Sequence, residues 1–407
     1  MPLRERRSRR PAKRSGRAAR AVRGNGRRRR SSLFPLVALA ATVAAHGARA
    51  QTTTPLVGTH ISADSVRHAM AIPSHDGVRG RIDSTGYALH ASQMAKVWEL
   101  SGSPPAPDSL GPAPAPGVAA VLCPHDDFNF AGRVYRRVIP LVTARTVVLF
   151  GVFHGYWRIG ERNRLVFDTY REWSAPDGPV RVSQLRDALL ARLPRADWTQ
   201  DSVAHDMEHS LEPLVCWLRH VNPDLEIVPI IVPAASFDRF QALADHLGGA
   251  LEAELKARGW RLGQDVAIAI SADGIHYGPD FKQLTFGEGV PAYRKATAKD
   301  RGLLLGPLRG PLDVAKIRAL YETFVDPDHP DTYRWTWCGR FSIPLGLLTL
   351  ERIAGGGATG WPVAYATSIS GPELGLRDIG MQPGSPSNLY HFVGYPGAAF
   401  TVGVAGH

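Results

Sequence analysis

Three apolar stretches of the sequence each lead to a histidine, and these histidines are the first residues that could do chemistry. The stretches and their histidines are 118–122 with His125, 146–152 with His154, and 265–271 with His276. Small and β-branched residues dominate each stretch, which predicts buried strands. Ligands of α/β proteins bind outside the carboxyl ends of the strands. The sequence therefore predicts that imidazoles meet at one edge of a sheet, where they could bind a metal ion or move protons.

Further ionisable side chains lie beside these histidines. They are Asp126 and Asp127 after the first, Asp273 before the third, and the cluster His205, Asp206, Glu208 and His209. Four ionisable groups within five positions exceed what the capping of the following helix, predicted at 210–221, requires. A metal-bound histidine generally has a hydrogen-bond acceptor behind it. Asp206, Glu208 or Asp273 could be that acceptor.

One of the three cysteines stands at a position that favours reactivity. Cys338 precedes a glycine at the start of a predicted apolar helix. A helix N-terminus lowers the pKa of a thiol and favours the thiolate, which is the form that binds metal or attacks a substrate. Cys123 and Cys216 are interpreted as small buried apolar residues. An odd number of cysteines leaves at least one unpaired within the chain.

The hydrophobic pattern predicts a single three-layer α/β/α domain with a mixed central sheet over residues 78–407. Further strands are predicted at 226–232 and 361–366, the latter as the final central strand, and a hairpin within 164–182. Helices are predicted at 89–100, 131–142, 183–193, 210–221, 237–258, 298–305, 312–324 and 341–353. Residues 279–297 are expected to be irregular and residues 326–332 to form a polar loop.

The positive charge of the chain is concentrated at its beginning. The 407 residues have a formal net charge of +11, but residues 1–50 contain 15 of the 48 basic residues and one acid, Glu5. The rest of the chain has 33 basic and 36 acidic residues and is mildly acidic. A nucleic-acid-binding domain needs a basic face, so no nucleic-acid partner is expected.

The basic beginning has the three-part pattern of a secretory signal peptide. Arg27–Arg30 precede an apolar run at 33–45, and Ala48-Arg49-Ala50 provides a cleavage site before Gln51. The run is short for a membrane span, so no stable span is expected after cleavage. We therefore expect residues 1–50 to be a signal peptide of the Sec or twin-arginine type and residues 51–77 to be a flexible segment. The mature protein is expected to be periplasmic or secreted.

Five segments in order resemble the Memo family, called in microbes the AmmeMemoRadiSam system protein B family. They are Pro124-His125 with Ala131-Gly132, Phe150-Gly151 to His154, Glu208-His209-Ser210-Leu211-Glu212 leading to 227–230, Ser271 to Gly278, and Cys338-Gly339. The resemblance runs from about Arg79 to about Tyr395. It implies a fold similar to class III extradiol dioxygenases, metal ligands His125, His154 and Cys338, and catalytic roles for His209, Asp273 and His276. Asp126, Asp127 and Gly155 depart from the family pattern.

Two imidazoles and a thiolate can bind iron or copper, and also zinc, because ligand type alone does not select the metal. One hypothesis is a metal-dependent oxidoreductase in which His209 or His276 moves protons. A second is a non-catalytic envelope protein that sequesters copper or iron. A third is a module that binds a small molecule, a peptide or an envelope partner. A fourth is a hydrolase with Cys338 as nucleophile.

Overall fold

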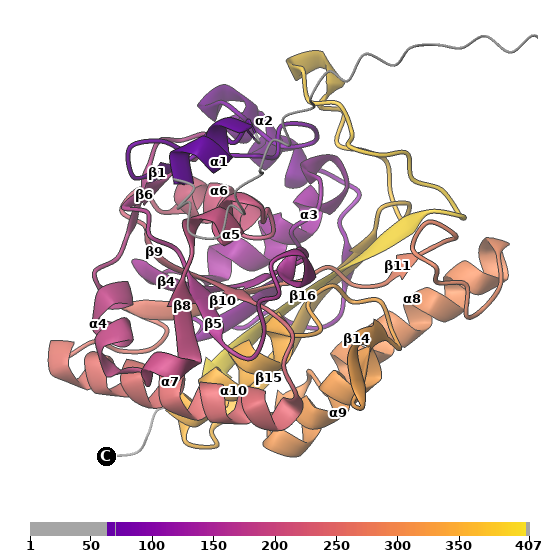
Figure 1. Cartoon of the computed structure of the whole chain (residues 1–407). Helices are drawn as coiled ribbons and strands as arrows, with labels where there is room; N and C mark the ends of the chain where they lie inside the picture. Colours follow the sequence, from indigo (N-terminus) through magenta and orange to yellow (C-terminus); the bar gives the residue numbers. More distant parts are fainter. Residues whose placement is uncertain (1–62, 70, 404–407) are drawn as a thin grey trace, which may run out of the picture. The chain divides into compact units, whose positions relative to one another are not determined.

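The computed structural model describes residues 63–69 and 71–403 (Figure 1). The predicted signal peptide lies outside the described residues, as do residues 51–62 and 70 of the predicted flexible segment. Ala63–Ala69 form helix α1. No described helix combines the length and apolar character that crossing a membrane requires.

As the sequence predicts, the described residues form an α/β domain around a mixed sheet. This sheet has 14 strands. Its main path runs β1-β6-β7-β9-β4-β10-β3-β16-β15-β12. The strands are β1 (Val78–Arg79), β2 (Asp108–Ser109), β3 (Ala120–Cys123), β4 (Thr146–Val152), β5 (Leu165–Phe167), β6 (Glu172–Trp173), β7 (Val180–Val182), β8 (Trp198–Gln200), β9 (Glu226–Val232), β10 (Val266–Ser271), β11 (His276–Tyr277), β12 (Gly310–Pro311), β15 (Ala358–Thr367) and β16 (Phe392–Val402). A separate hairpin pairs β13 (Val325–Asp326) with β14 (His329–Tyr333).

The register of the parallel strands brings the predicted site residues to one edge. β9, β4, β10 and β3 are parallel neighbours. Ser271 at the end of β10 lies opposite Cys123 at the end of β3, and Ile270 lies opposite Phe150 of β4. The chain segments that carry the site residues therefore leave the sheet side by side.

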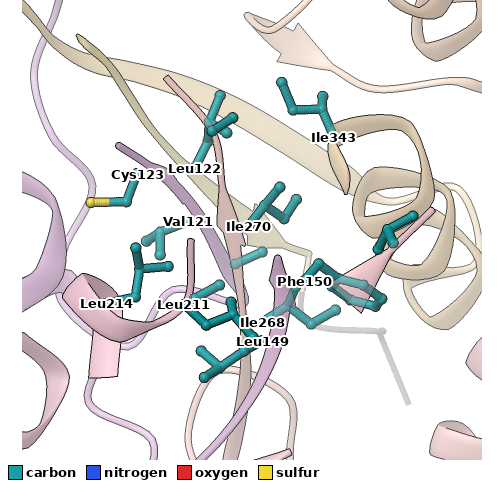
Figure 2. Packing of buried hydrophobic residues seen from close by; sticks show 14 of the residues in the cluster. Val121, Leu122, Cys123, Leu149, Phe150, Leu211, Leu214, Ile268, Ile270 and Ile343 are labelled. Carbon is teal, nitrogen blue, oxygen red and sulfur yellow. The ribbon is translucent and has the colours of Figure 1, made fainter. Parts of the chain in front are cut away.

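Helices pack around the sheet. They are α2 (Ala91–Ser101), α3 (Phe128–Val138), α4 (Leu185–Arg192), α5 (Ser202–Asp206), α6 (Glu212–Val221), α7 (Phe237–Arg258), α8 (Gly289–Leu305), α9 (Val314–Phe324) and α10 (Ser342–Ala354). Figure 2 shows Leu211 and Leu214 beside Val121 and Leu149, whereas Ile343 of α10 lies on the other side of the strands. Close packing explains Gly346 of α10, because a Cβ atom there would lie 2.6 Å from Ile270.

Three local predictions are wrong. Helix α8 begins at Gly289, within the segment expected to be irregular, and buries Ala292 and Ala296. The expected polar loop contains the β13–β14 hairpin. The final central strand is β16, which pairs with β3 on one side and β15 on the other. Proline and glycine are uncommon in strand interiors, so Pro396 and Gly397 concealed this strand.

Candidate metal centre

His125 is the buried centre of the site. Its backbone N–H donates to Oδ1 of Asp273 at 2.9 Å, and its Nδ1 lies 2.7 Å from Oγ of Ser271. Ser271 donates its own proton to the carbonyl of Ser210, so its oxygen accepts from Nδ1–H of His125. Burial, together with the neighbouring His154 and His209, holds the pKa of His125 well below its usual value. The imidazole is therefore neutral, and its Nε2 lone pair is free to bind a metal.

His154 brings a second imidazole from the end of β4. Its ring contacts that of His125 with the centroids 5.4 Å apart, and its side chain is 40% exposed. Its backbone N–H donates to Glu208 at 2.6 Å, and Nδ1 lies 3.0 Å from the same carboxylate. Burial would raise the pKa of Glu208, but His154, His209 and the Ser210 N–H hold it below its usual range. Glu208 thus fixes Nδ1 and leaves Nε2 of His154 as the free donor.

His209 completes a group of three imidazoles. Its ring centroid lies 5.4 Å from that of His125 and 5.2 Å from that of His154. Nδ1 of His209 lies 2.8 Å from Oδ2 of Asp83. Burial would lower the pKa of His209, but the hydrogen bond and charge of Asp83, with Glu208, raise it to about 10. Without a metal, His209 is therefore a hydrogen-bonded cation at neutral pH.

Cys338 and Asp273 lie on the buried side of His125. Sγ of Cys338 and Oδ2 of Asp273 are 3.6 and 3.3 Å from Nε2 of His125. Burial and the Asp273 carboxyl raise the pKa of the Cys338 thiol well above its usual value. The expectation that a helix N-terminus lowers this pKa is wrong, because α10 begins only at Ser342 and Cys338 is 5% exposed. The N–H of Asp273 donates to Sγ at 3.0 Å.

These five residues form two overlapping groups of metal donors. One is His125, His154 and His209, and the other is His125, Asp273 and Cys338; within each, the donor atoms lie within 4.8 Å of one another. Metal–nitrogen and metal–sulfur bonds are about 2.0 and 2.3 Å long, so the 3.6 Å between Nε2 of His125 and Sγ of Cys338 suits two ligands of one ion. The site thus fits a transition metal, while the choice of His125, His154 and Cys338 as its ligands stays a prediction.

The remaining predicted residues have different surroundings. His276, in β11, is outside both donor groups; its Nδ1 lies 3.1 Å from the carbonyl of Gly274, and its ring packs on Phe281. Of the three predicted acceptors, Glu208 contacts His154 and Asp273 contacts His125. Asp206 instead accepts hydrogen bonds from Ser74 and Tyr170.

The two carboxylates after His125 are held by the protein itself. Asp126 accepts hydrogen bonds from the hydroxyl of Tyr395 and the N–H of Asp127, both at 2.7 Å. Asp127 caps α3 through the N–H of Asn129 and also accepts the N–H of Gly384. Neither belongs to a donor group.

Three supporting residues were missed by the sequence analysis. Ser271 lay within a recognised segment, but its contact with His125 depends on two strands meeting. Asp83 stands in a loop with no distinguishing pattern. Asp300 of α8 accepts the indole N–H groups of Trp335 and Trp337, each at 2.8 Å. It also accepts the N–H of Ile275 and the hydroxyl of Tyr365, so it fixes the segments next to Cys338 and Asp273.

Comparison with known proteins identifies the family of this chain. A model of the family described as Memo-like protein matches residues 106–373. A MEMO1 family protein of Archaeoglobus fulgidus is 31% identical over 171 residues, which is 42% of this chain and 59% of the relative. Another, of Pyrococcus abyssi, is 28% identical over 57% of this chain and 74% of the relative. A third, of Aquifex aeolicus, is 27% identical over 40% of each. The predicted resemblance is therefore confirmed: this chain belongs to the Memo family.

Proposed function

We propose that this chain is an exported metal-binding protein that uses iron or copper as a metal-dependent oxidoreductase, with His125, His154 and Cys338 as the ligands. Zinc fits the same donors. The observation that carries the proposal is that His125 belongs to both donor groups. A histidine held in one tautomer by Ser271 is already prepared to bind a metal.

The surplus donors give the proposed reaction its proton-handling groups. With three residues on the metal, His209 and Asp273 remain beside it. A bound iron or copper ion would supply redox chemistry. His209 can give a proton to a bound substrate and take up another from solvent, because the Asp83 carboxylate 2.8 Å from its Nδ1 favours the charged imidazole. His276 stays a further candidate for proton transfer.

The first test is the metal content of the protein purified without a histidine tag. We expect about one metal ion per chain in the native protein, and none in the double variant His125→Ala/Cys338→Ser. His246→Ala is the matched control, because His246 lies on helix α7 and pairs with Asp197. Folded protein that takes up no metal even after reconstitution would refute the proposal and favour a partner-binding module.

The second test asks for turnover. The iron-loaded protein is mixed with a panel of catechols, and oxygen consumption is compared with that of the same amount of free iron. Consumption above the free-iron level that disappears in the double variant supports an oxidoreductase. Metal binding without such consumption supports the alternative, a non-catalytic protein that binds copper or iron.

One feature favours the alternative specifically. Cys338 supplies a buried thiol, and sulfur ligands suit Cu(I). If the protein sequesters copper, Cys338→Ser should weaken Cu(I) binding far more than Fe(II) binding. Equal losses for the two ions would argue against copper handling.

Export rests on the sequence of residues 1–50. The test is expression of the full chain in a bacterium, followed by fractionation and N-terminal sequencing. We expect a mature chain that begins at Gln51 in the periplasm or medium. A full-length chain that stays in the cytoplasm would refute export without affecting the metal site.

A further inference from the structure

A cavity of about 390 Å³ opens beside the candidate metal centre. His154 and Cys338 line it, as do Tyr156, Trp157, Arg162, Asp331, Tyr333, Arg340 and Phe341. Binding sites for small molecules usually measure about 300–1,000 Å³. A ligand in this cavity would touch two of the predicted metal ligands and would therefore lie where a substrate must lie.

The charges lining the cavity do not cancel. Arg162 binds Asp331 through two N–H groups, both at 2.9 Å, so this pair is neutral. Arg340 is the second guanidinium, and only 6% of it is exposed. Its described acceptors are uncharged: the carbonyl of Asp331 at 3.1 Å and the hydroxyl of Tyr156 at 3.3 Å. No described carboxylate forms an ion pair with it.

A buried cation without a counter-ion is costly unless something neutralises it. A guanidinium has five N–H donors in a planar fork that suits a carboxylate, and two of them have described acceptors here. The side chain also cannot swing away freely, because the guanidinium stacks 3.7 Å from the ring centroid of Tyr333 and 4.7 Å from that of Phe341. Arg340 is thus a fixed guanidinium at the wall of the cavity, where it and Arg162 share a single carboxylate, that of Asp331, and it can donate hydrogen bonds to an anion.

The remaining wall is aromatic. Tyr156 and Phe341 meet edge to face with centroids 5.9 Å apart. Trp157 is 62% exposed and Tyr333 is 40% exposed, although both border the cavity. Large aromatic side chains left open in a cavity offer stacking surface to a planar ligand.

We infer that this cavity binds a small aromatic carboxylate, with its carboxylate on Arg340 and its ring against the aromatic wall. The ring would then lie next to His154 and Cys338. As a statement about the substrate class, this inference rests on the proposed function. As a statement about binding, it needs no metal, so the two can be tested separately.

The test compares two probes of nearly equal size, an acid with a charged carboxylate and the amide that replaces this carboxylate by a neutral group. Binding of 4-hydroxybenzoate and of the neutral 4-hydroxybenzamide to the full chain is measured by titration calorimetry. The measurement is made first on protein freed of metal with a chelator and then on protein loaded with iron. We expect the acid to bind about 10- to 100-fold more tightly, as for hydrogen bonds to a charged group. Equal binding of acid and amide to the native protein would overturn the inference without any variant.

Variants then locate the binding. Arg340→Met should abolish the preference for the acid. Arg145→Met is the control, because it also removes one positive charge but Arg145 pairs with Glu226 away from the cavity. This variant should leave the preference for the acid unchanged. Trp157→Ala should weaken acid and amide equally, because stacking does not depend on the charge of the ligand. A preference that survives in Arg340→Met would overturn the inference.

Folding and metal binding are controlled separately. If Arg340→Met does not give the thermal unfolding transition of the native protein, Arg340→Lys replaces it; a retained charge without the planar fork should reduce the preference but not abolish it. An unchanged preference in Arg340→Lys would reduce the role of Arg340 to charge alone and overturn the assigned geometry. Acid-selective binding in protein that takes up no metal would refute the proposed function and leave this inference standing.

Discussion

The two donor groups around His125 differ in what they allow a metal to do. His154 and His209 are 40% and 33% exposed, and each has a carboxylate behind it, Glu208 and Asp83. Asp273 and Cys338 are almost fully buried and contact each other through an N–H and a sulfur atom. The open group lets ligands exchange with solvent, and the buried group can select the metal. One histidine that joins both could combine access with selectivity.

The largest expected effect comes from the residue that the groups share. His125→Ala removes a donor from both, so we expect metal affinity to fall by more than about 100-fold, since losing an outer contact alone costs about 10- to 100-fold. Competition with a chelating dye measures it, with His246→Ala as the control. A loss no larger than that of His154→Ala would show that the two groups act independently.

The next expected effect is on the pH dependence of metal affinity, which differs between the two donor groups. Burial raises the pKa of the Cys338 thiol well above its usual value, so the thiol keeps its proton at neutral pH without metal. Binding through the thiolate must release that proton, which means that affinity rises with pH, about tenfold per unit per proton. His125, whose pKa is lowered, releases none.

Affinity measured between pH 6 and 8 should therefore rise by about 100-fold or more in the native protein. In Cys338→Ser, the rise of metal affinity with pH should be smaller by the tenfold per pH unit that release of the thiol proton contributes. His209 is protonated without metal as well, but it would release its proton only if it bound the metal itself. An unchanged slope would place the metal on the open group.

A smaller effect is expected from the support of the open group. Glu208→Gln keeps the size of the side chain but weakens its hold on Nδ1 of His154, and such changes cost about 10- to 100-fold in metal affinity. Glu226→Gln, at the amino end of β9, is the control. If Glu208→Gln left affinity unchanged while Cys338→Ser abolished it, the buried group alone would hold the metal.

The smallest effect on the metal is expected at Asp300. Asp300→Asn presents an amide N–H₂ to side-chain and backbone donors, so buried donors lose their acceptor and the free energy of unfolding should fall by about 1–3 kcal/mol. Metal affinity of the folded variant should change little, since none of the hydrogen-bond partners of Asp300 belongs to the two groups of metal donors. Urea unfolding measures the stability, and Asp238→Asn, on an exposed helix surface, should be neutral. A large loss of metal from the folded variant would show that the Trp337 segment sets the position of Cys338.

Much of the frame was predictable because burial leaves a direct mark on the sequence. β4, β9 and α7 have the predicted boundaries, because the apolar runs of the two strands and the helical spacing of apolar residues in α7 can be read from neighbouring residues alone. The ends of such strands identified His125 and His154 as residues that meet. The resemblance to the family identified Cys338 as a third ligand. Sequence spacing alone could not place it near His125 and His154, because the nearer of the two lies 184 positions earlier.

The unpredicted parts depend on contacts between distant segments. Asp83 acquires its role only when its loop reaches His209, 126 positions later. The pKa of Cys338 depended on its burial beside Asp273 and not on its place before a helix. The pairing of Asp331 with Arg162 leaves Arg340 as the arginine without an ion pair in the cavity, and no sequence pattern distinguishes Arg162 from Arg340.

Strand β16 also fixes when this site can exist during synthesis. Residues 392–402 insert between β3 and β15, and Tyr395 binds Asp126 beside the first histidine. A ribosome must therefore translate the chain as far as Val402 before β3 gains its second neighbour. The nascent chain up to that point holds every proposed ligand but lacks the strand that completes their frame. Metal capture should thus be one of the last steps in maturation, after translation of this strand.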